Sequence, residues 1–251
     1  ANTYRIIYDA NRPSGASGTI RGSMAAAKHV YDKTASLAAN RFKLVGWTFL
    51  GWSQNPNAAA ADLTDGAEVL NLTDTDGAAV TLYAVWKANT YSITFNTEGG
   101  STAETISATY DGTLPALAPP TRKGYNFNGY YTGRDGSGTA YFDADGNALT
   151  GYTVAGDTAL YAYWTPIRYN IELYSRGKYV GIIENVIFGA MRLPSAGSLG
   201  ISRDNYDFVG WNLYDDQNWA MYNADTDYGA GIAGAEGETV ILCAAWSERP
   251  I

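Results

Sequence analysis

An aromatic–glycine motif that occurs three times constrains the fold of this chain more than any other feature. It reads Gly-Trp-Thr-Phe-Leu-Gly-Trp at 46–52, Gly-Tyr-Asn-Phe-Asn-Gly-Tyr at 124–130 and Asn-Tyr-Asp-Phe-Val-Gly-Trp at 205–211. The central Phe residues of the three copies are separated by 78 and then 81 positions. Recurrence at a nearly fixed period indicates tandem structural units.

A second signature, Leu-x-Ala-x-Trp, follows each motif, at residues 82–86, 160–164 and 242–246. With 20 Tyr, 7 Trp, 7 Phe and 28 Gly among 251 residues, the composition is typical of strands and turns. We therefore predict three small domains, with boundaries 1–88, 89–166 and 167–251.

Each predicted domain opens with an alternating run of apolar and polar residues, at 4–9, 91–96 and 169–174. Alternation with period two predicts strands that bury one face. Return strands are expected at 19–23, 105–110 and 179–188. Only four residues separate Trp86 from Tyr91, and Trp164 from Tyr169. Because such joints are too short to act as flexible tethers, we expect an elongated, semi-rigid string.

The first domain differs from the others by an Ala-rich stretch at residues 25–44, which we interpret as an insertion. Ala has the highest intrinsic helix propensity of the amino acids. This stretch is therefore the best helix candidate in the chain.

The repeated aromatic and glycine positions are expected to build the core, because three copies on strand-like segments are what a core needs. A glycine inside such a segment suggests a bulge or a close approach of backbone. The predicted core positions are Trp47, Phe49, Gly51, Trp52, Trp86, Tyr125, Phe127, Gly129, Tyr130, Trp164, Tyr206, Phe208, Gly210, Trp211 and Trp246.

The charge distribution disfavours anionic partners. The net charge is −8, and the three predicted domains carry +1, −4 and −5. An acidic surface repels phosphate backbones, so no nucleic-acid partner is expected. No apolar run is long enough to span a membrane, and no signal segment opens the chain, so we expect no membrane insertion here.

Catalytic constellations are absent from the sequence. The chain has one histidine, His29, and one cysteine, Cys243, and no Gly-x-Ser-x-Gly elbow. A single cysteine excludes an intrachain disulfide and a cysteine-based zinc cluster, and a lone cysteine in a strand is typically a buried thiol. We therefore expect no enzyme activity and no cofactor.

Residues Asp143, Asp145 and Asn147 are the candidates for a metal site, because they begin like a calcium-binding EF-hand loop. That loop requires Gly at its sixth position and Glu at its twelfth, where this chain has Ala148 and Val154. An ordinary Asp–Gly turn is the favoured interpretation, and calcium binding is the alternative.

Aromatic residues outside the motifs are the candidates for a binding surface. Four of them lie in the last predicted domain: Tyr214, Trp219, Tyr222 and Tyr228. Others are Tyr131, Tyr141 and Tyr152. Such residues either stack on a sugar or partner, or pack locally within their own loops.

The full pattern of residues 91–164 resembles the Listeria–Bacteroides repeat, also called the internalin B-repeat. It runs Tyr-x-Ile-x-Phe-Asn, Gly-Gly, Leu-Pro, Pro-Thr-Arg-Lys-Gly-Tyr-x-Phe-x-Gly-Tyr-Tyr and Leu-Tyr-Ala-x-Trp. The first predicted domain departs from it by residues 25–44, and the last by a missing Gly-Gly turn and Cys243. The resemblance implies a β-rich α+β fold, with small β-grasp (ubiquitin-like) repeat domains and a mainly antiparallel sheet.

The resemblance also implies a non-catalytic repeat module in a bacterial surface or secreted protein. Such a module spaces its neighbouring domains in a larger chain and takes part in adhesion or protein binding. Its partner is expected to be a protein or glycan on a host or neighbouring cell. The alternative is a carbohydrate-binding module that uses the loop aromatics around Trp219.

Overall fold

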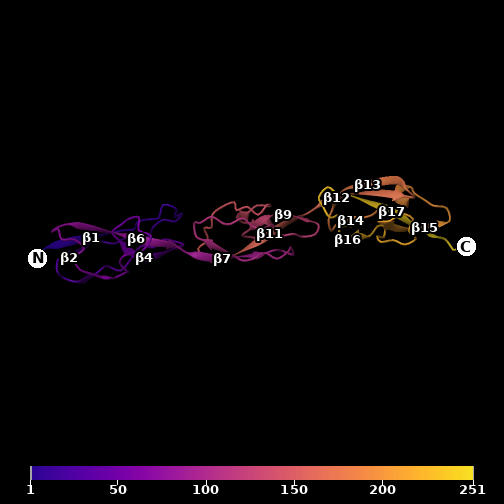
Figure 1. The fold of residues 1–251 in the computed structure, drawn as a ribbon. Coiled ribbons are helices and arrows are strands. Elements are labelled where there is room, and N and C mark those ends of the chain that lie inside the picture. Colours follow the sequence, from indigo (N-terminus) through magenta and orange to yellow (C-terminus); the bar gives the residue numbers. More distant parts are fainter. Residues whose placement is uncertain (1, 251) are drawn as a thin grey trace. The chain divides into compact units, whose positions relative to one another are not determined.

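The computed structural model describes residues 2–250, and its architecture is almost entirely β-structure (Figure 1). Three sheets follow one another along the sequence. The N-terminal sheet, in the order β2-β1-β6-β4, contains β1 (Thr3–Asp9), β2 (Ala27–Val30), β4 (Trp47–Ser53) and β6 (Ala79–Ala88). The middle sheet, in the order β10-β9-β11-β7-β8, contains β7 (Thr90–Asn96), β8 (Ile106–Thr109), β9 (Tyr125–Tyr131), β10 (Ala140–Phe142) and β11 (Thr158–Pro166).

The C-terminal sheet has the order β13-β12-β17-β15. Its strands are β12 (Arg168–Ser175), β13 (Lys178–Ile187), β15 (Tyr206–Asn212) and β17 (Thr239–Glu248). Two small ribbons pair β3 (Ala35–Ser36) with β5 (Glu68–Val69), and β14 (Met191–Arg192) with β16 (Asp227–Tyr228). Within the described residues, the helices are single 3-10 turns, η1 (Arg134–Gly136) and η2 (Gly197–Leu199).

Most strand pairs are antiparallel, as predicted. In the two four-stranded sheets, the first and last strands instead run parallel: β1 with β6, and β12 with β17. Internal contacts divide the chain into two compact units. The first holds the chain up to Phe95 with Glu104–Leu117 and Asn147–Leu160, and the second holds Asn96–Ala103, Ala118–Gly146 and the chain from Tyr161 onward. Every side-chain contact described below lies within one of these units.

Each motif phenylalanine lies between two other aromatic rings. Phe49 is 5.0 Å from Trp52 and 5.6 Å from Trp86, measured between ring centroids. Phe127 lies 5.1 Å from Tyr130 and 5.3 Å from Trp164. Phe208 lies 5.5 Å from both Trp211 and Trp246. These tilted and edge-on contacts are the favoured geometry for aromatic pairs.

The tryptophan of each Leu-x-Ala-x-Trp signature closes its sheet by donating an indole hydrogen bond. Trp86 Nε1 donates to the carbonyl of Ala10 at 2.8 Å, directly after β1. Trp164 Nε1 donates to the carbonyl of Thr97 at 2.8 Å, and Trp246 Nε1 donates to Ser175 Oγ at 3.3 Å. The last strand of each sheet is thereby fixed to the end of the first.

The motif glycine after each phenylalanine accommodates a crossing backbone. Gly51, Gly129 and Gly210 have φ angles of 139°, 113° and 136°. A Cβ atom on them would fall 2.3, 2.2 and 2.5 Å from carbonyl oxygens of Leu63, Phe142 and Tyr222, respectively. The strand pairing shifts register at Phe49/Gly51 and at Phe208/Gly210, so the predicted bulge is confirmed.

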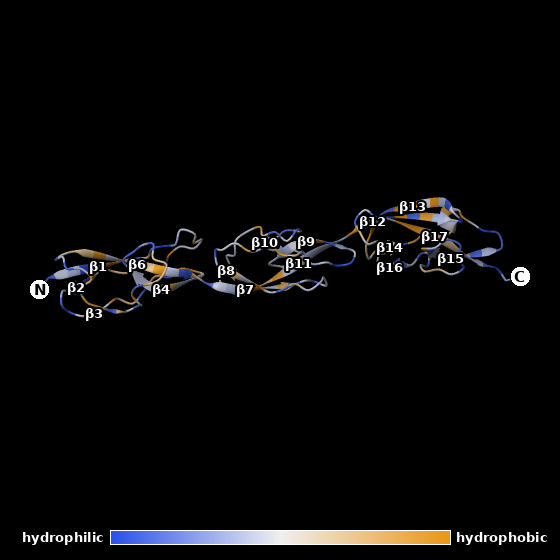
Figure 2. Ribbon diagram, in the orientation of Figure 1, coloured by the Kyte–Doolittle hydropathy of each residue, from blue (hydrophilic) through white to orange (hydrophobic). Residues whose placement is uncertain are grey.

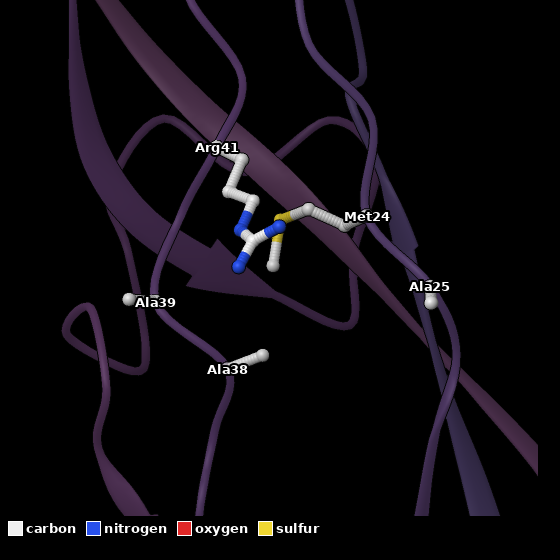
Figure 3. Close-up of a pocket in the computed structure, with 5 residues that line it drawn as sticks. All are labelled: Met24, Ala25, Ala38, Ala39 and Arg41. Atoms are coloured by element: carbon white, nitrogen blue, oxygen red, sulfur yellow. The ribbon is translucent and has the colours of Figure 1, made fainter.

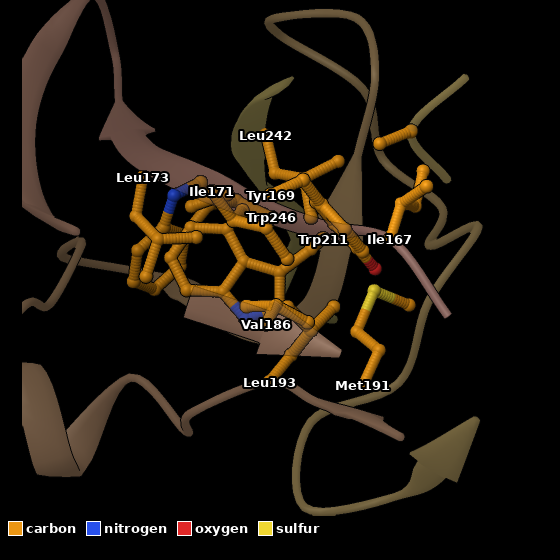
Figure 4. Close-up of a cluster of buried hydrophobic side chains, with 12 residues drawn as sticks. Ile167, Tyr169, Ile171, Leu173, Val186, Met191, Leu193, Trp211, Leu242 and Trp246 are labelled. Carbon is orange, nitrogen blue, oxygen red and sulfur yellow. The ribbon is translucent and has the colours of Figure 1, made fainter. Parts of the chain in front are cut away.

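Apolar side chains of the C-terminal sheet gather in one cluster (Figure 4). Tyr169, Ile171 and Leu173 alternate inward along β12 and are at most 1% exposed. Figure 2 shows the corresponding bands of apolar and polar residues along the strands of this sheet. Trp211, fully buried, lies at the centre of the cluster with Trp246.

The Ala-rich stretch is not a helix, which corrects the prediction for residues 25–44 and the α part of the predicted fold class. Its first part is strand β2, whose residues Ala27–Val30 pair with Thr3–Ile6 of β1. Its second part contains the short strand β3 and extended chain. Ladder hydrogen bonds to β1 and burial of His29 outweigh the weak helix preference of alanine. The return strand of this sheet is therefore β2, and the one predicted at 19–23 is wrong.

Candidate functional site

Exposed apolar side chains concentrate in the C-terminal part of the chain. Residues 167–250 carry seven of the eleven exposed large apolar residues among the described positions: Tyr179, Ile182, Leu213, Tyr214, Trp219, Met221 and Ile241. Four of them belong to the loop that follows β15, which we call the aromatic loop (residues 213–222). Large apolar side chains that gather on a protein surface are candidates for interaction sites.

The aromatic loop has a backbone counterpart in the N-terminal sheet. Trp211 and Tyr222, eleven positions apart, exchange backbone hydrogen bonds of 2.8 and 3.0 Å. Trp52 and Leu63 exchange bonds of the same lengths across the same number of positions. The two loops are therefore built on one frame.

A buried polar residue fixes each loop from inside. Asn212 accepts a hydrogen bond from Tyr214 N at 3.1 Å and donates one to the Trp219 carbonyl at 3.2 Å. In the N-terminal loop, Ser53 accepts a bond from Asn55 N at 3.0 Å and donates one to Asp62 Oδ2 at 2.5 Å. Both Asn212 and Ser53 are fully buried.

Residues at matched positions show what the aromatic loop adds to this frame. Counted from Trp52 and Trp211, Tyr214 stands where the N-terminal loop has Asn55, and Trp219 stands where it has Ala60. The side chains of Tyr214 and Trp219 are 64% and 50% exposed. The frame forms without these two rings, so they are available for contacts outside the chain.

The other two predicted binding residues are held differently. Tyr222 and Tyr228 pack against the apolar cluster of the C-terminal sheet, with ring centroids 5.5 Å apart. The Tyr228 hydroxyl bonds to the backbone of Asn223. Of the aromatics outside the motifs, Tyr141 and Tyr152 are buried, which corrects their interpretation as surface candidates. A binding role for Tyr222 and Tyr228 stays a prediction.

The candidate metal loop forms a turn. Asp143 Oδ1 accepts a hydrogen bond from Asp145 N at 3.0 Å, and Gly146 N donates to the Asp143 carbonyl at 3.1 Å. Within residues 2–250, no three His, Cys, Asp or Glu side chains gather as metal ligands would. These hydrogen bonds are those of the Asp–Gly turn that the sequence favours, and calcium binding at Asp143, Asp145 and Asn147 stays an untested alternative.

The two side chains with the strongest nucleophile or base character lie in the interior. His29 stacks on Tyr4 with ring centroids 5.5 Å apart, and burial lowers the pKa of His29. Cys243 is buried, as predicted, and burial together with the charge of Asp215 raises the pKa of its thiol. Burial shields both side chains from solvent, and the raised pKa keeps the Cys243 thiol protonated at neutral pH.

A hollow in the N-terminal part of the chain lies between the segments around Met24 and Arg41 (Figure 3). It is lined by Met24, Ala25, Ala38, Ala39 and Arg41 and measures about 260 Å³. That volume is below the range of small-molecule sites. Its lining offers one guanidinium and no carboxylate or nucleophile, so it does not resemble a catalytic centre.

The first motif also forms a joint with the middle sheet, within the first compact unit. A Cβ atom on Gly46 would fall 2.2 Å from the ring of Tyr110, so this ring packs directly on the glycine backbone. Asn89 N donates to the Gly46 carbonyl, and Tyr110 N donates to the Asn89 carbonyl, both at 2.9 Å. We call these contacts the first joint.

A carboxylate completes the first joint. Asp111 Oδ2 accepts hydrogen bonds from Trp47 Nε1 at 2.9 Å and from Ser17 N at 3.0 Å. Burial opposes ionisation of Asp111, but the bonds from Ser17 and Trp47 and the charge of Arg12 outweigh it, so the pKa of Asp111 lies below its ordinary value. The joint therefore holds an ionised carboxylate at neutral pH.

The second motif forms the same kind of joint within the second compact unit. A Cβ atom on Gly124 would fall 2.3 Å from the ring of Phe188. Ile167 N donates to the Gly124 carbonyl, and Phe188 N donates to the Ile167 carbonyl, both at 3.0 Å. The ring of Tyr125 packs edge-on against Phe188 at 5.7 Å. We call these contacts the second joint.

The middle of the chain can be assigned by comparison with known proteins. Residues 91–163 match the family model of the Listeria-Bacteroides repeat domain. These residues form a Listeria-Bacteroides repeat domain. The resemblance predicted for this stretch is therefore confirmed, and this repeat domain carries the Gly124–Tyr125 turn of the second joint and the Tyr110–Asp111 pair of the first.

Three bacterial proteins show similarity to parts of this chain. Internalin H of Listeria monocytogenes is 35% identical over 121 residues, which cover 48% of this chain and 19% of that protein. Two proteins of Evansella cellulosilytica are also similar. One, named "Putative membrane protein", is 27% identical over 208 residues, or 81% of this chain and 28% of that protein. The other, named "Putative Gly-rich membrane protein", is 30% identical over 132 residues, or 53% and 14%.

The chain thus spans less than a third of the length of each of these relatives. Between residues 2 and 250, no helix has the length and apolar character needed to cross a membrane.

Proposed function

We propose that this chain is a non-catalytic module of a bacterial surface or secreted protein, built as three tandem β-grasp-like repeats. In this proposal it acts as a semi-rigid spacer and carries an adhesion surface for a partner protein. The names of the relatives, a membrane protein and an internalin, support the surface location. The parallel pairing of first and last strands, flanked by a hairpin strand, supports β-grasp-like topology in the N- and C-terminal sheets.

The observation that carries the spacer role is the repetition of the joint. Both joints place an aromatic ring on a motif glycine and use the same two backbone hydrogen bonds. Each joint thereby fixes the four-residue link on both sides. A module that only needed a flexible tether would not require matched packing at both links.

A Gly124→Asn variant tests the spacer role. Asn205 occupies the matching position of the third motif with a φ of 61°, so asparagine fits this backbone conformation. Its Cβ atom would displace the Phe188 ring. With spin labels at Thr139→Cys and Lys178→Cys and Cys243→Ser removing the native thiol, we expect a narrow distance distribution that broadens in Gly124→Asn.

The matched control for this experiment is Gly189→Asn, where a Cβ atom would meet one backbone oxygen at 3.6 Å and the φ angle is also positive, at 88°. That variant should leave the distribution narrow. A distribution that is already broad in the native chain would contradict the spacer role.

The adhesion surface is proposed to be the aromatic loop. Tyr214 and Trp219 are flanked by the exposed aliphatic residues Leu213 and Met221. Trp, Tyr and Met are enriched at protein–protein interfaces, where large rings anchor a partner. The mixture of aromatic and aliphatic side chains favours a protein partner. The two exposed rings favour, as the second candidate, a neutral sugar, because Asp215 and Asp216 beside them would repel acidic glycans.

The two candidates are separated by the binding of the fluorescently labelled chain to epithelial cells. A protein partner predicts that protease treatment of the cells abolishes binding and that periodate oxidation of their glycans does not. A sugar partner predicts the reverse, with binding to neutral glycans on an array. In either case Trp219→Ala should weaken binding at least about tenfold, as removal of a central aromatic anchor does.

Trp219→Ala is expected to leave the loop backbone intact, since the N-terminal loop forms the same frame with Ala60 at the matching position. If Trp219→Ala and Tyr214→Asn bind as the native chain does, the aromatic loop is neither the protein-binding nor the sugar-binding surface.

A further inference from the structure

The N-terminal sheet presents the same pair of residues that the middle sheet inserts into the first joint. Tyr31 and Asp32 follow β2 just as Tyr110 and Asp111 follow β8. Tyr31 N donates to the Asn2 carbonyl at 2.8 Å, matching the bond from Tyr110 N to Asn89. Asp32 and Asp111 have positive φ angles of 58° and 60°. The two pairs are therefore held in the same backbone conformation.

The two pairs differ in what covers them. The ring of Tyr110 is 6% exposed beneath Gly46, whereas Tyr31 is only partly buried. Asp32 Oδ1 accepts a hydrogen bond from Asn71 Nδ2 at 2.8 Å. Its Oδ2 atom accepts none from residues 2–250, although Oδ2 is the atom with which Asp111 binds Trp47 and Ser17. Tyr31 thus offers an aromatic ring for packing, and Asp32 offers Oδ2 as a hydrogen-bond acceptor.

Comparison with the second joint indicates which kind of turn the carboxylate of Asp111 binds. There Tyr125 takes the place of Trp47, so the facing turn has no indole donor. At the place of Asp111 the chain has Gly189. A carboxylate is present where a Gly–Trp turn faces it and absent where a Gly–Tyr turn does. Asp32 therefore matches a Gly–Trp turn.

We propose that Tyr31 and Asp32 form a docking surface for the Gly–Trp turn of another repeat of this kind, joined ahead of Thr3 in the same polypeptide. In this arrangement the ring of Tyr31 packs on the glycine, and Asp32 Oδ2 accepts from the indole N–H. The inference rests on the spacer role proposed above and adds to it the identity of the partner.

A second copy of this chain cannot supply that turn. At its matching end, Arg249 N donates to the Asn205 carbonyl at 2.8 Å, as Asn89 does to Gly46. Asn205, however, carries a Cβ atom where a ring would pack, and Tyr206 replaces the tryptophan. The contact is also small, so it needs the high effective concentration that a short covalent link provides.

The test is a fusion of residues 1–249 of one copy to residues 3–251 of a second, so that Arg249 is joined directly to Thr3. Arg249 then takes the place of Asn2 and reproduces the link length of both joints. Spin labels at Lys178→Cys of the first copy and Lys28→Cys of the second, with Cys243→Ser in both, report the distance distribution across the new junction. Circular dichroism and urea unfolding verify that both copies fold.

The native fusion is expected to give a broad distribution, because Asn205 and Tyr206 mismatch the surface. Asn205→Gly combined with Tyr206→Trp in the first copy should narrow the distance distribution. The reference width is that of the first joint in the native chain, measured with labels at Lys28→Cys and Ser107→Cys. Adding Asp32→Ala or Tyr31→Ala in the second copy should broaden the distribution again.

A doubly substituted fusion that stays broad, or a native fusion that is already narrow, would overturn the docking proposal. The first joint of the native chain keeps the two hypotheses apart. If that joint is itself broad, the spacer role fails; if it is narrow while the doubly substituted fusion is broad, only the inference about Tyr31 and Asp32 fails.

Discussion

Gly129→Ala is expected to destabilise the repeat domain by about 3 kcal/mol or more, a large part of the stability of a domain this size. The new Cβ atom would fall 2.2 Å from the carbonyl oxygen of Phe142, which belongs to a neighbouring strand and cannot rotate away. The residue would also keep a φ of 113°, which L side chains rarely adopt. Urea unfolding with peptide-resolved hydrogen exchange would measure the loss and locate it.

Gly77→Ala is the matched control. Gly77 also has a positive φ, 73°, but a Cβ atom there would meet nothing within 4 Å. Only backbone strain is added, so a cost of about 1–2 kcal/mol is expected. If Gly129→Ala and Gly77→Ala lowered the free energy of unfolding equally, the carbonyl of Phe142 would not be the reason for a glycine at position 129.

Trp211→Ala is expected to cost about 3–5 kcal/mol, because it empties the centre of the C-terminal core. The indole is fully buried, contacts Phe208 and donates from Nε1 to the Pro194 carbonyl at 2.8 Å. Hydrogen exchange should rise throughout β12, β15 and β17. The measurement is the urea midpoint of the variant against the native chain.

Trp219→Ala, eight residues away, removes the same side chain from the surface. Trp219 is 50% exposed and its frame forms with alanine in the N-terminal sheet, so a change within about 0.5 kcal/mol is expected. A large cost for Trp219→Ala would mean that the ring supports the loop, and a small cost for Trp211→Ala would contradict the core described here.

Local patterns in the sequence predict most of the strands. Alternation marks β1, β7 and β12, and the glycine between Phe49 and Trp52 marks the bulge in β4. These features depend on neighbours within a few residues, which a reader of the sequence sees directly. The family of residues 91–163 follows from the same motifs.

The helix prediction for the Ala-rich stretch is wrong because contacts with distant residues determine the structure of this stretch. Ala27–Val30 become a strand through pairing with Thr3–Ile6, and nothing between residues 25 and 44 signals that pairing. Helix propensity is a weak preference that such tertiary contacts override. The real insertion of this sheet is the long connection from β1 to β2, which places Ser17 against Asp111.

The joints and the aromatic loop need the structure for a different reason. Gly46 and Tyr110 are in contact although they are 64 positions apart, and nothing in the sequence around either residue indicates this contact. The loop around Trp219 has no counterpart that the sequence alone reveals; the bridge between Trp211 and Tyr222 matches the bridge between Trp52 and Leu63 and identifies it. Tyr141 and Tyr152 look like loop aromatics, yet they are buried.

The parallel pairing of first and last strands has a mechanical consequence. In the N-terminal sheet the chain enters at the start of β1 and leaves at the end of β6, and the register joins Arg5–Asp9 to Ala79–Tyr83. Tension along the polypeptide therefore pulls these neighbouring strands in opposite directions along their own axes. Their hydrogen bonds are loaded together in shear and do not open one at a time, and the same holds for β12 and β17. Tension applied through the two ends of either sheet would therefore meet its greatest resistance at these strand pairs.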